Sequence, residues 1–330
     1  MTRALVWVVG EGGLLGSHVR RLLPEAMPGC SSWRRPEPRL PWGREELEGA
    51  LSRELRAFLD AAKAGFDAWV ILWCAGAGVI QTDDAALKAE SLTFERFLSR
   101  LGQHRPGPEK RIPGFVALAS SAGGVYGDHT EGPLTESTQC WPVSEYGRQK
   151  LRQENALRVW SDIAPDVGWL IGRFSTLYGT GQNLFKPQGF ISQLIRALLF
   201  RRPMQVYVPL DTQRDFLFVE DAARHLLHCV AFLLPAAKPG RIVKIFAAGR
   251  SVALSEVVAL LSHLSKQPVR ILGARTAQRN LHPVKLVFRS VALRELPLPP
   301  TASLAAGISK VYSHQLRLLQ RGVLPPPHSV

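Results

Sequence analysis

One short segment, residues 6–16, constrains the fold of this chain more than any other. Its sequence, VWVVGEGGLLG, is a strand-like apolar run that leads into Gly10, Gly13 and Gly16 at G-x-x-G-x-x-G spacing and then into a helix-like segment. Glycines here permit a tight turn and a close approach of the backbone to a pyrophosphate, while the helix N-terminus supplies unpaired N–H groups and a positive dipole end. This junction predicts a dinucleotide site; the alternative is a glycine-rich turn with no ligand.

Strand-like and helix-like segments alternate through the first half of the chain. The predicted strands are residues 4–9, 66–74, 115–120 and 167–174, and helical patterns start at residue 17 and cover 44–64, 85–101 and 144–160. Strands that alternate with helices of this length favour an α/β fold with a Rossmann-type, doubly wound parallel sheet.

After residue 175 the pattern changes to shorter elements. Helices are predicted at 190–201, 221–234, 254–264 and 304–320, and short strands at 204–208 and 216–219. This half predicts a smaller α+β lobe that partly interleaves with the first. We expect residues 1–175, plus about 214–248, to form the dinucleotide-binding domain, and 176–213 and 249–330 to form a substrate-binding lobe.

The chain is strongly basic, with a formal net charge of +14 over 330 residues. Such a charge indicates a polyanionic partner, either nucleic acid or an anionic membrane surface. The alternative is that it reflects a generally arginine-rich composition without a charged partner. The arginines are spread along the chain, and basic segments are not interleaved with aromatics as in single-strand binders, so nucleic acid is not favoured. A phosphate-bearing substrate explains part of the excess equally well.

Several signals place the protein in a reducing compartment and away from the membrane. The apolar runs are too short or too interrupted for a transmembrane helix, and the N-terminal run is typical of a buried strand rather than a signal peptide. The cysteines form no C-x-x-C pair and no metal-ligand spacing, so we expect no metal site and a cytoplasmic location. They are Cys30, Cys74, Cys140 and Cys229.

The cofactor type depends on the end of the second expected strand. An acidic residue there holds a free ribose 2′-hydroxyl, but the sequence is CSSWRR, residues 30–35, with no Asp or Glu. Arg34 and Arg35, with Ser31 and Ser32, suit a 2′-phosphate, because guanidinium groups bind phosphate oxygens in pairs. We therefore predict NADP in preference to NAD; the alternative is two solvated surface arginines.

Tyr146 and Lys150 share one face of a predicted helix, because they are four residues apart. A lysine ammonium near a phenol favours the phenolate and lowers the tyrosine pKa from about 10. Such a tyrosine exchanges a proton with a hydroxyl or carbonyl while a hydride moves to or from a nicotinamide. The alternative is a surface helix pair. Upstream, the hydroxyl-bearing sequence ASSAGGVYG, residues 119–127, follows a strand and lies at the sheet edge where such folds bind ligands.

Together these segments resemble the extended short-chain dehydrogenase/reductases, in the nucleotide-sugar branch of the NAD-dependent epimerase/dehydratase family. The resemblance covers nearly the whole chain. The segments that carry it are GEGGLLGSH, WVILWCAGAG, SSAGGVYGD, SEYGRQKLRQE, GRFSTLYGTGQ, TQRDFLFVEDAA and FAAGRSVALSEVV.

The resemblance implies a role for each matching residue. Tyr146 would be the general acid/base, and Lys150 would hold the ribose hydroxyls and lower the tyrosine pKa. Arg214 would contact the diphosphate of a nucleotide-sugar, unless it only pairs with Asp215 or Asp221. Gly10, Gly13, Leu14, Leu15 and Gly16 would cradle the pyrophosphate, Cys74, Ala75 and Gly76 would line the nicotinamide ribose, and Ser121 and Thr176 would face the substrate.

The departures from the family pattern concern the substrate side. The usual catalytic Ser or Thr is replaced by Ala122, so we predict that the neighbouring Ser121 takes its role, with Ser120 as the alternative. Thr176 stands where the family has a substrate-contacting Asn. Gly123 and Gly124 replace the Asp–Glu pair of the dehydratases, which makes dehydration unfavoured.

We therefore predict an NAD(P)-dependent nucleotide-sugar epimerase or ketoreductase. The alternatives are a non-catalytic NADP(H)-binding sensor or regulator of the same fold, a nucleotide-sugar dehydratase, and, from the charge alone, an RNA-associated member. Family members commonly dimerise through the helices equivalent to 85–101 and 144–160, so we expect a homodimer. Core packing explains the apolar stripe of the first of these helices equally well.

Overall fold

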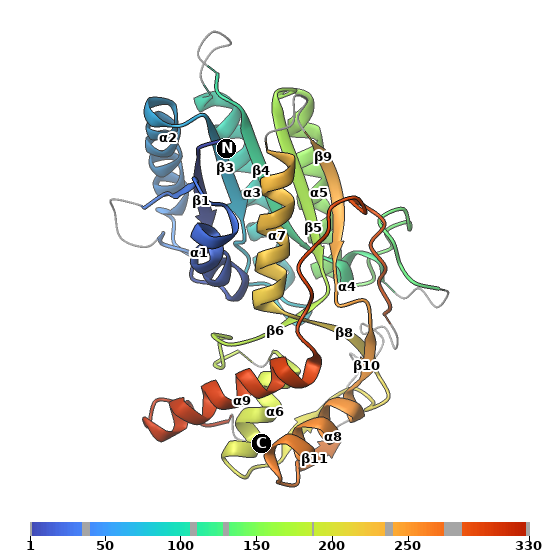
Figure 1. Ribbon diagram of the computed structural model, residues 1–330. Helices are drawn as coiled ribbons and strands as arrows, with labels where there is room; N and C mark the ends of the chain where they lie inside the picture. Colours follow the sequence, from blue (N-terminus) through green and yellow to red (C-terminus); the bar gives the residue numbers. More distant parts are fainter. Residues whose placement is uncertain are drawn as a thin grey trace.

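The central sheet of the computed structural model contains six parallel strands in the order β2-β1-β3-β4-β5-β9 (Figure 1). The structure describes residues 2–34, 40–105, 111–127, 132–186, 188–234, 240–273 and 286–327. The predicted Rossmann-type fold is confirmed. The strands of this sheet are β1 (Ala4–Val9), β2 (Ser31–Ser32), β3 (Ala68–Trp73), β4 (Gly114–Ser121), β5 (Val167–Phe174) and β9 (Arg241–Phe246).

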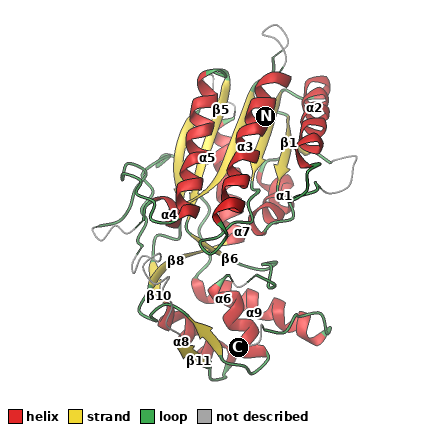
Figure 2. Cartoon of the chain, turned by 180° about the vertical axis from the view of Figure 1, so that it is seen from behind, coloured by secondary structure: helices red, strands yellow, loops and turns green. Residues whose placement is uncertain are grey.

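Helices cover both faces of this sheet. Helices α1 (Leu14–Ala26) and α7 (Val219–Leu233) pack on the face seen in Figure 1. Helices α2 (Leu47–Gly65), α3 (Asp84–His104) and α5 (Glu145–Asp162) cover the opposite face (Figure 2). Because both faces are covered, strands such as β5 are buried at every position, and their sequences are mainly apolar along their length rather than alternating.

A second group of elements lies beyond the carboxyl ends of the strands (Figure 1). Helices α6 (Phe190–Leu199), α8 (Leu254–Ser265) and α9 (Leu304–Gln320) share a separate apolar core there. Short strands complete this group: β6 (Thr176–Tyr178), β8 (Gln213–Phe218) and β10 (Ser251–Ala253) form one sheet, and β7 (Met204–Val206) pairs with β11 (Ile271–Gly273).

We propose this second group as the substrate-binding lobe, although the sequence analysis places most of β8 in the first domain, within about 214–248. Two elements from the second half of the chain, α7 and β9, pack with the central sheet, and both lie within the segment of about 214–248 that the sequence analysis adds to the first domain. The tail also returns to the first domain, because Leu293, Leu296 and Leu298 pack against the core that α1 and α7 cover.

The strand order places the reversal of the sheet between β1 and β3. In open α/β sheets, ligands bind outside the carboxyl ends of the strands at this reversal. Gly10 follows β1 and Cys74 follows β3, so both predicted cofactor segments start at this point. No helix within the described ranges has the length and apolar character needed to cross a membrane.

Candidate active site

The glycine turn after β1 depends on three close backbone approaches. Gly10 has φ +89°, a left-handed conformation that favours glycine. A Cβ on Gly10 would lie 2.6 Å from the backbone of Ala75, and a Cβ on Gly16 would overlap the Gly10 carbonyl oxygen. The Gly13 amide donates to that same oxygen at 2.9 Å. The turn is therefore built so that β1, β3 and the start of α1 can meet at van der Waals distance.

Helix α1 begins without a side-chain cap. Its N-cap is Gly13, whose backbone is extended and which offers no side chain to the amides of the first turn. These N–H groups and the positive end of the helix dipole suit an anion such as a pyrophosphate. Leu15 is buried beside them and Leu14 is half-buried, so these two residues contribute backbone N–H groups rather than polar side chains.

His18 connects α1 to the segment after β6. Its Nδ1 lies 2.9 Å from the Leu14 carbonyl oxygen and its Nε2 lies 3.4 Å from Thr180 Oγ1. Burial lowers the pKa of His18, which keeps the ring neutral. With Nδ1 donating to the carbonyl, Nε2 is the acceptor for the Thr180 hydroxyl. His18 thus links α1 to the segment after β6.

The end of β2 carries the predicted 2′-phosphate residues. The Trp33 amide donates to the Val6 carbonyl at 2.7 Å, and the Trp33 indole donates to Glu54, so this side chain turns toward the core. Arg34 follows with an exposed side chain. Arg35 lies outside the described residues.

The loop after β3 lies directly against the predicted catalytic lysine. The Cys74 amide donates to the Val9 carbonyl at 2.8 Å, and burial raises the pKa of the Cys74 thiol to about 12, so this thiol is uncharged. Gly76 has φ +149°, and a Cβ placed on it would be 3.3 Å from Lys150 Nζ. The structure therefore places Gly76, in the loop after β3, next to Lys150.

Tyr146 and Lys150 lie on the first two turns of α5. Ser144 caps this helix by accepting a hydrogen bond from the Gly147 amide. Lys150 is 8% exposed; its Nζ lies 5.9 Å from the centroid of the Tyr146 ring and donates to Gln153 Oε1 at 3.3 Å. The Lys150 ammonium thus lies beside Gly76 and close to the Tyr146 ring.

A glycine contact sets the position of Tyr146 against the loop after β4. A Cβ on Gly147 would overlap the Gly124 carbonyl oxygen, and a Cβ on Gly124 would lie 3.0 Å from Tyr146 Cε1. Any side chain at 124 would therefore press on the tyrosine ring.

The two candidate serines at the end of β4 have different partners. Ser121 caps the short helix α4 (Ala122–Val125), its Oγ accepting from the Gly124 amide at 3.2 Å. Ser120 is buried, and its hydroxyl donates to Glu154 Oε1 at 2.7 Å. Because the Ser121 hydroxyl accepts a hydrogen bond, its own proton can still be donated to another partner. The Ser120 hydroxyl already donates its proton to Glu154. Ala122 is fully buried in the core.

A buried polar network that the sequence analysis missed lies behind these residues. Arg173 and Glu154 form a paired contact, Nε to Oε1 at 2.9 Å and Nη2 to Oε2 at 2.6 Å, and both side chains are almost fully buried. Arg173 also donates to the Tyr126 hydroxyl, which in turn donates to the Thr135 carbonyl. Burial raises the pKa of Tyr126 to about 12, so it stays protonated. The one feature of the sequence that could have indicated this network is Arg173, a charged residue inside the otherwise apolar strand VGWLIGRF.

The predicted substrate residues lie on the small sheet of the second lobe. Thr176 on β6 is exposed and is in register with Phe216 of β8. Arg214 on β8 donates to the Gln213 carbonyl at 2.8 Å, and burial lowers its pKa to about 10. The neighbouring Asp215 accepts from the amides of residues 248 and 250. Arg214 is therefore a partly desolvated cation, which suits an anionic ligand.

The sequence model of the NAD dependent epimerase/dehydratase family matches residues 6–245 of this chain. The chain belongs to the NAD dependent epimerase/dehydratase family. The match runs from β1 to the end of the central sheet, so it covers the glycine turn, the Tyr146–Lys150 pair and Arg214.

Similar proteins agree with this membership. The uncharacterized UDP-glucose epimerase YtcB of Bacillus subtilis is 30% identical over 157 residues, which are 48% of this chain and 46% of that protein. The chain thus spans about half the length of the curated relatives it matches. MoeE5, solved in complex with UDP-glucose and NAD, has a TM-score of 0.75 at 23% identity, over 95% of this chain and 99% of that one. RMD from Pseudomonas aeruginosa, complexed with NADPH, has a TM-score of 0.72 at 21% identity, over 95% and 99%.

Proposed function

We propose that this family member is an NAD(P)-dependent nucleotide-sugar epimerase or ketoreductase that uses Tyr146 as its general acid/base. The observation that carries the proposal is the convergence of Lys150, Tyr146 and the side-chain-free Gly76 at the carboxyl edge of the sheet. The uncapped start of α1 and the glycine turn fit a dinucleotide pyrophosphate at the same edge. The partly desolvated Arg214 fits the diphosphate of a nucleotide-sugar.

In this proposal each side chain has a separate task. Tyr146 gives a proton to, or takes one from, the sugar oxygen whose carbon changes oxidation state, and the Lys150 ammonium lies close to its ring. Ser121 donates its free proton to the same sugar oxygen and fixes the sugar orientation. When bound, the nicotinamide supplies the hydride chemistry.

The glycines at 123 and 124 favour epimerisation or reduction over dehydration. Neither residue has a side chain that can carry a proton, and a longer side chain at 124 would meet the Tyr146 ring. Ala122 in place of the usual hydroxyl favours the second candidate, a non-catalytic dinucleotide-binding sensor, because it removes one substrate-polarising group. The intact Tyr146–Lys150 geometry favours the enzyme.

Release of bound cofactor by denaturation tests this proposal together with a turnover assay. We expect a dinucleotide to be recovered and identified by mass, and turnover with UDP- or dTDP-linked sugars or their 4-keto derivatives. Tightly retained cofactor supports an epimerase, and exchangeable NADPH supports a reductase. Dinucleotide binding without turnover on any of these sugars supports the sensor instead.

NADP is the cofactor we propose, on the strength of Arg34 at the end of β2. Replacing Arg34 with Ala is expected to weaken NADP binding about tenfold and to leave NAD binding unchanged, since the lost bond is to a charged phosphate. Titration of intrinsic fluorescence measures both affinities. Lys63→Ala, which removes one charge near the C-terminus of α2 at the opposite edge of the sheet, is the matched control. Equal weakening for both cofactors would show that Arg34 adds only general charge.

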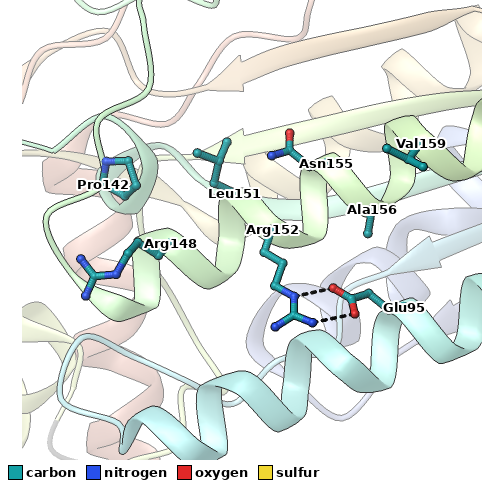
Figure 3. Close-up of a pocket in the computed structure, with 8 residues that line it drawn as sticks. All are labelled: Glu95, Pro142, Arg148, Leu151, Arg152, Asn155, Ala156 and Val159. Atoms are coloured by element: carbon teal, nitrogen blue, oxygen red, sulfur yellow. Dashed lines mark hydrogen bonds and ion pairs between the residues drawn. The ribbon is translucent and has the colours of Figure 1, made fainter.

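A homodimer through α3 and α5 is the assembly we propose. Most of the apolar stripe of α3 is used by the core of the chain itself, since Leu92 is its one exposed member. The outer face of α5 and the residue that follows it instead carry the exposed apolar surface, with Val159 69% exposed and Ile163 76% exposed. A shallow hollow lies on this face (Figure 3), lined by Glu95, Pro142, Arg148, Leu151, Arg152, Asn155, Ala156 and Val159.

Val159→Asp is expected to convert the dimer to a monomer at micromolar concentration, because it places a charge in an apolar seam. Analytical ultracentrifugation measures the mass. Phe232→Asp, which changes an exposed apolar residue of α7 on the other face of the sheet, is expected to leave the dimer intact. A wild-type chain that sediments as a monomer of 36 kDa contradicts the assembly.

A further inference from the structure

Glu90, on α3, holds the cofactor loop from a position that no motif indicates. Its Oε1 accepts hydrogen bonds from the amides of Ala77 at 2.7 Å and Gly78 at 2.8 Å. From the other side, Lys186 of the substrate lobe donates to the Ala77 carbonyl at 3.0 Å. The peptide groups of Ala77 are thus bound by a carboxylate and by an ammonium from different parts of the chain, which fixes the loop after β3.

The second carboxylate oxygen of Glu90 has a different environment. A Cβ on Gly76 would lie 3.6 Å from Glu90 Oε2 and 3.3 Å from Lys150 Nζ, and a Cβ on Gly78 would lie 3.1 Å from the same Oε2. Within the described ranges, Oε2 makes no hydrogen bond, although the same carboxylate is half-buried. A free charged acceptor and a charged donor therefore face one small space, which exists because residue 76 has no side chain.

This pairing matches a vicinal diol. Each hydroxyl of a diol both donates and accepts, so a site with one ammonium and one carboxylate satisfies both directions, whereas Lys150 alone can only donate to it. A carboxylate acceptor also forms a stronger bond than a neutral one. The loop that Glu90 holds includes Gly76, which the family resemblance places at the ribose next to the nicotinamide.

We propose that Glu90 is a cofactor-binding residue: its Oε2 accepts a hydrogen bond from a hydroxyl of the nicotinamide-side ribose, while Lys150 donates to the same diol. This inference rests on the proposed function, since it requires a dinucleotide in the cleft. It assigns Glu90 two tasks, with Oε1 fixing the loop and Oε2 binding the ribose.

Binding of ligand fragments tests the assignment without any turnover. ADP-ribose carries the second ribose and ADP lacks it, so the ratio of their affinities, measured by calorimetry, isolates that ribose. Glu90→Gln keeps an oxygen for the Ala77 and Gly78 amides but removes the charged acceptor. We expect it to lower the ADP-ribose to ADP affinity ratio about tenfold, with ADP affinity unchanged. Glu90→Ala is expected to lower the ratio at least as far and to lower the thermal midpoint as well.

The matched control is Glu95→Gln, on the same helix, where the carboxylate pairs with Arg152 on the outer surface. It is expected to leave the ratio at the wild-type value. An unchanged ratio in Glu90→Gln, or equal weakening of both ligands, would show that Glu90 only fixes the loop and would overturn the assignment. The assignment is also overturned if the wild-type chain binds ADP-ribose no more tightly than ADP. A wild-type chain that binds no NAD, NADP or ADP-ribose overturns the proposed function as well.

Discussion

Replacing Tyr146 with Phe is expected to lower kcat about a thousandfold while cofactor affinity stays within about twofold of wild type. The substitution removes only the phenolic oxygen, so the ring keeps its contacts with Gly124 and with the Lys150 ammonium. The proton on the sugar oxygen then has no acceptor or donor of suitable strength, and the barrier rises by the contribution typical of general acid–base groups. Turnover and cofactor titration on the same preparation separate the two effects.

The control for this substitution is Tyr207→Phe. Tyr207 is half-exposed on the substrate lobe, and its hydroxyl donates to the nearby Gln205 side chain. We expect kcat to stay within about twofold of wild type in this variant, because the lost bond lies on the surface. If Tyr146→Phe keeps full turnover, another group moves the proton. If the wild type has no turnover but binds dinucleotide, the sensor candidate replaces the enzyme.

Elements whose burial follows from their own composition were predictable from the sequence. The strand at 167–174 and the helix at 304–320 have the predicted bounds, because one is apolar except for Arg173 and the other has a clear helical period bounded by Ser303, which caps it. The glycine turn was equally predictable, since the spacing of its glycines reports local backbone approaches. In each case the physical cause lies within about a dozen neighbouring residues.

Elements that depend on tertiary partners were not predictable in this way. Strand β9, RIVKIF, contains charged residues, and Lys244 is buried in it only because the Ser290 hydroxyl and the Ala292 carbonyl accept its protons. Strand β2 consists of two serines and is defined by its register with β1. The apolar stripe of α3 could be interpreted from the sequence either as a dimer interface or as part of the core. In the structure, most of its residues are buried in the core of the chain.

The candidate site shows the same division. Tyr146 and Lys150 lie on one helix, so their shared face follows from the spacing alone. Glu90 reaches the loop after β3 from 13 residues away, and nothing in the pattern of α3 distinguishes it from the other acidic residues there. The choice between the two serines also required the structure, because it depends on the position of Glu154 two turns further along α5 than Tyr146.

The buried pair Arg173–Glu154 is expected to be the most sensitive point for stability. Arg173→Met would leave the Glu154 carboxylate almost fully buried, with Ser120 and Arg158 as its remaining partners among the described residues. Breaking a buried pair from one side costs about 3–5 kcal/mol, because the remaining charge is desolvated and uncompensated. We expect a loss of this size in the free energy of unfolding, measured by urea titration. Arg250→Met, which breaks an exposed pair with Glu256, is the control, with a loss of at most about 1 kcal/mol.

The double variant Arg173→Met, Glu154→Met distinguishes a charge effect from a packing effect. It removes both charges, and apolar replacements of a buried pair are often close to neutral. We expect it to recover most of the stability lost in Arg173→Met, because the Tyr126 hydroxyl keeps its bond to the Thr135 carbonyl. Failure to recover would mean that the side-chain shapes, and not the charges, hold α5 against β4 and β5. A loss below about 1 kcal/mol in Arg173→Met itself would mean that water reaches Glu154, contrary to its burial.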